Sequence, residues 1–210
     1  MKKVIFGLIA LFSSLGILAQ GFEGTIEFKK KTAFDTLHYV YYIKADKERT
    51  DEIGSKSKKV DGSFLIDLKA GTMLSLSHER KMYLEQKPPA PTTPGGECKV
   101  EKTKSQKVIL GYKCSEVTVK NSAENANITY YLAAGKFTFF NKMLKLLNRK
   151  DKFSTYYLTI PGTEGMFPVL AIMKTNDGNE TERMEATKIE KKALDVKMFD
   201  VPQGYTKFDK

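Results

Sequence analysis

The sequence predicts a mainly β protein of the α+β class, in which an antiparallel sheet of about 10–11 strands is joined by one amphipathic helix. Two observations lead to this prediction. Most of the chain after residue 20 alternates apolar and polar residues with period two, as strands do when one face meets a core and the other meets water. One segment, residues 136–150, follows the spacing of a helix instead.

The alternation places the strands in order along the chain. Alternate residues from Phe22 to Phe28 share the apolar face of the first strand. The second, Leu37 to Lys44, carries large apolar or aromatic side chains on both faces, so we expect it to be covered on both sides. The other predicted strands are Phe64–Leu68, Thr72–Leu76, Lys81–Gln86, Cys98–Ser105, Tyr112–Lys120, Asn127–Leu132, Thr155–Ile160, Phe167–Thr175 and Thr181–Lys191.

A proline-rich stretch interrupts the strands at residues 87–97. It begins KPPAPTTPGG, and prolines at this density prevent regular strand pairing, so we expect an exposed loop that serves as a lid or as a connector. Similar strands precede and follow it. We therefore expect residues 20–210 to form a single domain rather than two.

The helical segment 136–150 reads KFTFFNKMLKLLNRK. Its apolar residues Phe140, Met143, Leu144 and Leu147 recur at helical spacing, whereas Arg149 and the lysines fall largely on the polar face. We expect the apolar face to pack on the sheet. Binding to a membrane surface is the alternative that such a pattern leaves open.

The N-terminus has the three parts of a secretory signal peptide. Lys2 and Lys3 form a basic start, an apolar stretch follows, and small residues lead to an expected cleavage between Ala19 and Gln20. A transmembrane anchor is disfavoured because polar residues end the apolar run too early. No cysteine lies near the cleavage point. We therefore expect residues 1–19 to be removed and the protein to reach the periplasm or the cell exterior without a lipid anchor.

The formal net charge of +10, or +8 without Lys2 and Lys3, raises the question of nucleic-acid binding. The basic residues are spread among the strands with acidic residues between them, which is typical of solvated faces and protected sheet edges. An exported protein also does not meet nucleic acid. We expect no nucleic-acid partner and, at most, peripheral contact with an anionic membrane.

The chain has two cysteines, Cys98 and Cys114. In an oxidising compartment a pair of cysteines usually forms a disulfide, and we predict one here. On the chain-entropy model, closing a loop of this length contributes about 3 kcal/mol to stability.

No motif for a nucleophile, a metal or a phosphate appears, so we expect no catalytic residues, no metal, no cofactor and no enzymatic activity. His38 and His78 are interpreted as structural or surface residues. Asp46, Glu48, Asp51 and Glu52 lie beside basic residues and are interpreted as solvated ion pairs. A hydrolase with two converging carboxylates is the remaining enzymatic alternative.

Several motifs together resemble a known family. The segment Lys102–Val119, KTKSQKVILGYKCSEVTV, is similar to the central block of a family of secreted, uncharacterised Bacteroidota proteins, which is related to the family named for its GLPGLI motif. Other matching stretches are FEGTIEF, YYIKADKERTD, LIDLKAG, the YYL of Tyr130–Leu132 and the closing FDVPQGYTKFD.

These families resemble the LolA-like superfamily of lipoprotein carriers. The resemblance implies a strongly curved sheet, or half-open barrel, with a helix on its concave face and a hollow for acyl chains. The hollow would be lined by the aromatic strand and the helix, that is by Tyr39, Tyr41, Ile43, Phe140, Met143, Leu144 and Leu147. Tyrosine and methionine suit such a lining, although they also fill ordinary cores.

The hypothesis from the sequence is therefore a non-enzymatic envelope protein that binds a lipid or acyl chain. The alternative is a structural or interaction module without a small ligand, which binds another envelope protein through a sheet edge or the proline-rich loop.

Overall fold

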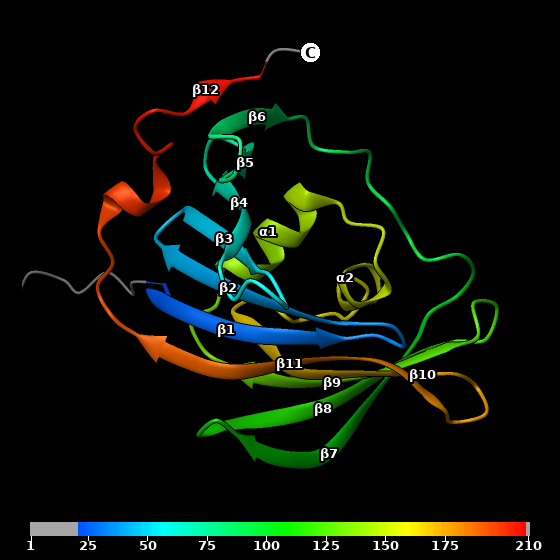
Figure 1. Ribbon diagram of the computed structural model, residues 1–210. Coiled ribbons are helices and arrows are strands. Elements are labelled where there is room, and N and C mark those ends of the chain that lie inside the picture. The colour runs from blue at the N-terminus through cyan, green and yellow to red at the C-terminus, as the bar shows by residue number, and fades with distance from the viewer. Residues whose placement is uncertain (1–20, 209–210) are drawn as a thin grey trace, which may run out of the picture.

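Twelve strands form one sheet that curls around two short helices in the computed structural model, which describes residues 21–208 (Figure 1). The predicted fold class is confirmed. The strands are β1 (Gly24–Lys31), β2 (Thr36–Lys44), β3 (Lys47–Ile53), β4 (Val60–Asp67), β5 (Thr72–Ser77), β6 (Met82–Gln86), β7 (Lys99–Ile109), β8 (Tyr112–Asn121), β9 (Ala126–Ala134), β10 (Met166–Lys174), β11 (Glu180–Lys191) and β12 (Thr206–Lys207).

The strand order is β12-β6-β5-β4-β3-β2-β1-β11-β10-β9-β8-β7. Most neighbours are consecutive antiparallel strands joined by short turns, whereas β12 lies parallel to β6. The pairing of β1 with β11 joins an early strand to a late one, and it brings together the meander β1–β6 and the meander β7–β10. Gly24 makes this pairing possible at its end, because a Cβ there would clash with the carbonyl oxygen of Glu190.

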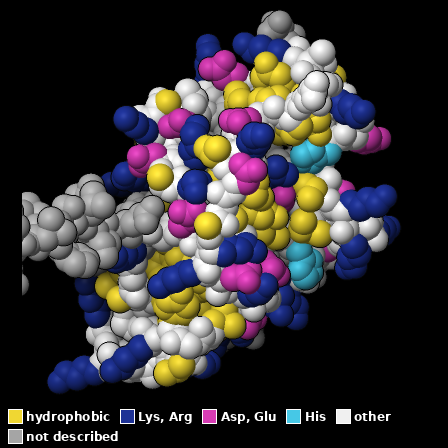
Figure 2. Space-filling model, turned by 90° about the vertical axis from the view of Figure 1, so that its left-hand side faces the viewer, with side chains coloured by type: hydrophobic (Ala, Val, Ile, Leu, Met, Phe, Trp, Pro, Cys, Tyr) yellow, Lys and Arg dark blue, Asp and Glu magenta, His cyan; other side chains and the backbone are white. Residues whose placement is uncertain are grey.

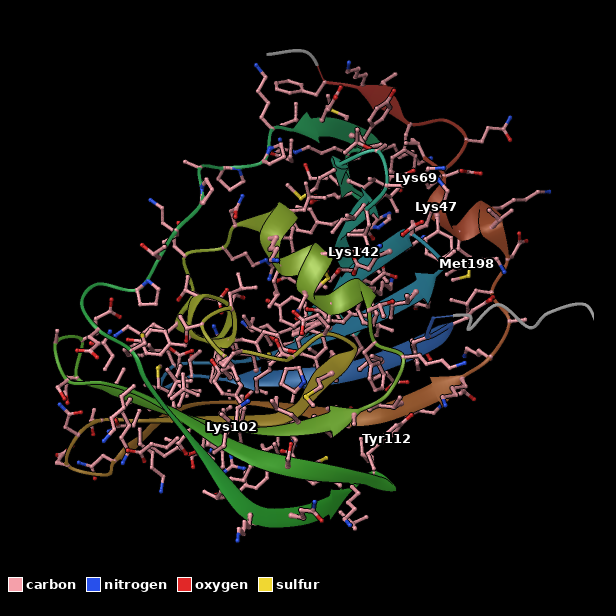
Figure 3. The ribbon with its side chains drawn as sticks, turned by 180° about the vertical axis from the view of Figure 1, so that it is seen from behind. Lys47, Lys69, Lys102, Tyr112, Lys142 and Met198 are labelled. Carbon is pink, nitrogen blue, oxygen red and sulfur yellow. The ribbon has the colours of Figure 1, made fainter. Side chains whose placement is uncertain are left out.

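The helix α1 (Phe139–Leu147) lies in the hollow of the sheet (Figure 1), as the spacing of its apolar residues predicted. Its buried side chains are Phe139, Phe140, Met143, Leu144 and Leu147. The helix ends at Asn148, which adopts a left-handed conformation and returns its N–H to the carbonyl of Leu144 at 3.0 Å. On the outer side, Lys142 reaches Asp46 in the β2–β3 turn at 3.2 Å (Figure 3).

A second helix, α2 (Lys152–Tyr157), occupies the place of the predicted strand Thr155–Ile160, so that prediction was wrong. Its threonine and tyrosines favour strands. Asp151 overrides this preference as the N-cap, because its side chain accepts the N–H of Ser154 at 3.1 Å. Tyr130 then donates to the carbonyl of Phe153 at 2.9 Å, which anchors the helix to β9.

The residues after β11 cover the outer face of β2, β3 and β4. This C-terminal segment, residues 192–208, includes the short helix η1 (Val196–Phe199). Lys44 donates to the carbonyl of Leu194 at 2.9 Å, and Arg49 donates to that of Met198 at 3.3 Å. The end of β2 is thus covered on both faces, as the sequence predicted. Figure 2 shows this side of the molecule, where basic and acidic side chains are interspersed.

The proline-rich loop runs between β6 and β7, along the open side of the sheet (Figure 1). Most of its residues are exposed, as predicted. Three hydrogen bonds hold it: Asn148 at the end of α1 donates to the carbonyl of Pro89 at 2.9 Å, Asn121 donates to that of Gly95 at 2.8 Å, and the backbone N–H of Gly95 donates to the carboxylate of Glu124. The loop therefore connects the two meanders and also contacts the helix.

The periodicity of the sequence did not predict two of the strands, β3 and β12. Charged residues obscured β3, and β12 is too short to show a pattern. The predicted signal peptide and its cleavage at Ala19 and Gln20 lie outside the described residues. The assignment of residues 20–210 to a single domain stays a prediction.

The predicted disulfide is absent, because Cys98 and Cys114 are both free thiols. The β7–β8 register explains this finding. Lys107 faces Cys114, whereas Lys99 faces Lys120, so the two cysteines lie near opposite ends of the hairpin. At about 3.4 Å per residue, six or seven residues of strand place their Cα atoms roughly 20 Å apart, and a disulfide requires less than 7 Å.

We predict that both thiols react with iodoacetamide when the protein is unfolded in urea without reductant. In the native protein the reaction should be slow, because burial raises the pKa of both thiols and Cys114 is fully buried. Intact mass spectrometry checks this. A protein that takes up no label until dithiothreitol is added would contradict the register.

Candidate functional site

A cavity of about 290 Å³ lies between the sheet and the junction of the two helices. Strands β1, β2, β10 and β11 form one wall, and α1, α2 and the connection between them form the other. The lining residues are Phe28, Lys30, Leu37, Tyr39, Tyr41, Phe140, Leu144, Leu147, Arg149, Lys150, Asp151, Phe153, Ser154, Phe167, Pro168, Met184 and Ala186.

The sheet wall is built from aromatic side chains on neighbouring strands. Phe28 of β1 stacks on Tyr39 with ring centroids 5.1 Å apart, and its centroid lies 4.5 Å from that of Tyr41. The strand alternation places all three rings on the concave face. Burial raises the pKa of both tyrosines, so their hydroxyls stay protonated at neutral pH.

The helix wall is apolar and well packed behind the cavity. Phe140 packs edge-on against Phe167 at 4.9 Å and against Tyr157 at 5.0 Å between ring centroids. Leu144 and Leu147 follow one and two turns later on the same face of α1. These contacts pack the rings closely behind the cavity.

Five of the seven residues predicted to line a cavity do line it: Tyr39, Tyr41, Phe140, Leu144 and Leu147. The other two, Ile43 and Met143, are fully buried in the core beside it. Strand and helix periodicity put all seven on inward faces. It does not distinguish a side chain that packs against another from one that faces open space.

The sequence did not predict the charged residues that line the cavity, nor the parts of the sheet wall that β1, β10 and β11 contribute. Lys30 lies on the same face of β1 as Phe28, and this alternation was a usable signal. Arg149 was placed on the polar face of the helix, but α1 ends at Leu147, and the left-handed Asn148 turns the chain. The contributions of β10 and β11 depend on tertiary pairing, which no local pattern reveals.

A carboxyl group is buried near the cavity. Glu48 of β3 is fully buried in a cross-strand row between Ile43 and Ile66, although the sequence suggested a solvated ion pair. Thr50 donates to its Oε1 at 2.5 Å, and its Oε2 has no hydrogen-bond partner among the residues that the structure describes. Burial raises the pKa of Glu48 to about 8, against the opposing effect of the Thr50 hydrogen bond and the Arg149 charge. The group is thus mainly protonated at pH 7.

Asp51 is also buried, so its interpretation as a solvated ion pair was wrong as well. It faces the outer side of β3, where Arg49 donates to it at 2.6 Å and Ser63 donates at 2.5 Å. Ser63 contacts His78 Nε2 at 2.7 Å, and His78 Nδ1 contacts the hydroxyl of Tyr205 at 2.6 Å. This network ties the C-terminal segment to the sheet. Glu48 and Asp51 face opposite sides of β3 and do not converge as a hydrolase pair would.

No group of three metal-ligating side chains comes together within residues 21–208. Over the same range, no helix is both long and apolar enough to span a membrane.

These features define a β protein whose curved sheet encloses helices and an apolar cavity. The chain belongs to the family described as a domain of unknown function, DUF4412, which matches residues 22–205. The resemblance to an uncharacterised family is confirmed to that extent, whereas the links to the GLPGLI family and to Bacteroidota stay predictions. No curated protein sequence matches the chain.

Solved structures similar in fold include an uncharacterized conserved protein from Thermus thermophilus, with a TM-score of 0.54, 7% identity and coverage of 91% of both chains. At this identity the likeness shows the fold alone. PNGF-II has a TM-score of 0.46 and 15% identity; the match covers 91% of this chain and only 31% of that chain. A putative outer membrane lipoprotein-sorting protein domain from Vibrio parahaemolyticus has a TM-score of 0.33 and 8% identity, with 84% and 87% of the two chains covered.

We predict that Glu48→Gln makes the protein more stable at pH 8. Between about pH 4.5 and 8 the folded state keeps a proton that the unfolded state releases, so the wild type loses stability as the pH rises through this window. The loss is on the order of a few kcal/mol. Glutamine stays neutral and should remove most of it. Urea unfolding at pH 5 and pH 8 measures both proteins.

Glu52→Gln on the same strand is the matched control, because the side chain of Glu52 is exposed. An equal pH dependence in wild type and Glu48→Gln would contradict the assignment.

Proposed function

We propose that this protein is a non-enzymatic carrier of the bacterial envelope that holds a lipid or acyl chain in the cavity between its curved sheet and its helices. The observation that carries the proposal is the cavity itself, because its two long walls are formed by aromatic and aliphatic side chains. Its volume of about 290 Å³ lies at the lower end of the range of small-ligand sites. The resemblance to the LolA-like carriers adds support for a periplasmic or extracellular role.

The chemistry of the lining favours a flexible apolar chain over a polar solute. Phe28, Leu144 and Phe167 offer only dispersion contacts, and each methylene transferred from water to such a surface contributes about 0.8 kcal/mol. Ten methylenes would therefore contribute about 8 kcal/mol. This gain is comparable to the cost of lost translational and rotational freedom on binding, which is roughly 4–15 kcal/mol. Ligand binding in this hollow needs no cofactor.

The direct test is to narrow the cavity. Ala186 of β11 is buried and lines it, so we predict that Ala186→Leu weakens the binding of a fluorescent acyl-chain probe by about tenfold, because the added side chain occupies the space of the ligand. Thr187→Leu is the control, since Thr187 is exposed and does not line the cavity.

Mass spectrometry of lipids extracted from protein purified from its native envelope identifies the ligand. A cavity that binds no probe, and protein that carries no lipid, would refute the carrier function.

A second candidate is an interaction module, which is favoured by the outer edge of β7. This strand of eleven residues is the last in the sheet, and nearly all of its central residues are exposed. An extended segment of another protein would add to it as a further strand. The proline-rich loop is the other exposed candidate surface.

We predict that replacing Pro88–Pro94 by glycine and serine residues of equal number leaves the thermal midpoint within a few degrees, since most of these side chains are solvated. Deletion is unsuitable, because the loop joins the two meanders. If the loop binds a partner, the replacement abolishes co-purification of that partner while Ala186→Leu retains it. The reverse pattern favours the carrier.

A further inference from the structure

Three basic side chains line the cavity beside its apolar walls. Lys30 comes from β1, and Arg149 and Lys150 come from the connection between α1 and α2. The acidic lining residue is Asp151, but its carboxylate already caps α2, where it accepts the backbone N–H of Ser154 at 3.1 Å and the Ser154 hydroxyl at 2.9 Å. The charged side of the cavity therefore has a surplus of positive charge.

The three cations differ in how they are compensated. Lys30 forms an ion pair with Glu182 at 3.1 Å and lies 5.5 Å from the ring centroid of Phe153. Lys150 is exposed. Arg149 is half-buried, yet within residues 21–208 it has neither a carboxylate partner nor a side-chain hydrogen bond. A guanidinium that is partly withdrawn from water normally has an anion beside it.

The buried carboxyl group of Glu48 does not serve as that anion. Arg149 is close enough to Glu48 to oppose the rise in the pKa of this residue, but burial has the larger effect, and Glu48 stays mainly protonated at pH 7. The positive charge of Arg149 also opposes the rise in the pKa of Tyr39 and Tyr41 in the cavity wall. The hydroxyl of Tyr39 makes no hydrogen bond within the described residues and stays protonated. The cavity lining thus holds this hydroxyl donor as well as the guanidinium.

We propose that the cavity takes a single acyl chain with an anionic head group, and that Arg149 binds this head group. The inference rests on the proposed carrier function and names its ligand class. The chain lies against Phe28, Leu144 and Leu147, and the head group lies at the α1–α2 connection. There the planar guanidinium donates two parallel hydrogen bonds to a carboxylate or phosphate, Lys150 adds long-range attraction, and Tyr39 donates a further hydrogen bond.

Two anionic probes and one neutral probe test this proposal on the delipidated, purified protein. They are palmitate, palmitoyl lysophosphatidate and monopalmitoylglycerol, which share the chain and differ in the head group. By titration calorimetry the wild type should bind at least one anionic probe about tenfold more tightly than the neutral one. This preference should shrink as the salt concentration rises, because ions screen the attraction.

Arg149→Gln should weaken the binding of the anionic probes far more than that of monopalmitoylglycerol, and so remove the preference. Arg149→Lys should restore part of it, since the charge remains but the two-bond geometry does not. Lys145→Gln is the matched control: it removes one exposed positive charge from α1 outside the cavity and should change no affinity. Circular dichroism of each variant confirms that it is folded, and Arg149→Lys keeps the test available if Arg149→Gln unfolds.

The outcomes separate the two proposals. Preference for palmitate identifies a fatty acid and preference for lysophosphatidate identifies a phosphate head group, and both support the inference if Arg149→Gln abolishes them. Equal binding of anionic and neutral probes, or a preference that survives Arg149→Gln, overturns the role of Arg149 and leaves the carrier function standing. Binding of none of the three probes refutes the carrier function as well.

Discussion

The concave face of the sheet has to be kept from water, and two short helices do this. Alternation along each strand sends a row of large apolar side chains into the hollow, such as Ile26, Ile128 and Tyr130, all with 0% exposure. A sheet of this curvature without α1 and α2 would present that surface to solvent. The positions of the core, the cavity and the charged connection all follow from how the helices cover it.

The helices cover the hollow incompletely, and this is why a cavity exists. They have nine and six residues, which corresponds to about 14 Å and 9 Å of helix, and they meet at residues 148–151. Beside this junction the cavity separates the sheet wall of Phe28, Tyr39 and Tyr41 from the helical side chains that line its other side. The same junction supplies Arg149, so the apolar space and the uncompensated charge have a common origin in one connection.

Buried tyrosines hold the helices at this position. Tyr130 donates to a carbonyl of α2, and Tyr157 donates to the carbonyl of Met166 at 3.1 Å. A short helix leaves most of its carbonyl groups without partners inside the helix, and these hydroxyls satisfy some of the backbone groups that would otherwise be buried unpaired. Each tyrosine thus contributes an aromatic ring to the core and a hydrogen bond to the backbone.

The fold class, ten of the strands and α1 were predictable because they depend on local periodicity. The helix α2 was not, since Tyr156 and Tyr157 favour a strand and only the cap at Asp151 and the contact from Tyr130 decide otherwise. Burial of Glu48 depends on its neighbours Ile43 and Ile66 across the sheet. Five residues of the cavity were identified from their faces, whereas Arg149 depends on where the helix ends. The prediction of a disulfide was wrong because the separation of two cysteines in the sequence does not determine the register of the strands that carry them.

The pairing of β1 with β11 also governs how the chain folds. Gly24 faces Lys191, so the central contact of the sheet joins residues that are separated by most of the described sequence. Long-range pairing of this kind is slow, because the chain has to close a large loop before the contact forms. Until Glu180–Lys191 arrives, one edge of β1 stays unpaired and able to recruit another strand. A strand that is synthesised late, β11, therefore protects an early strand, β1, from aggregation.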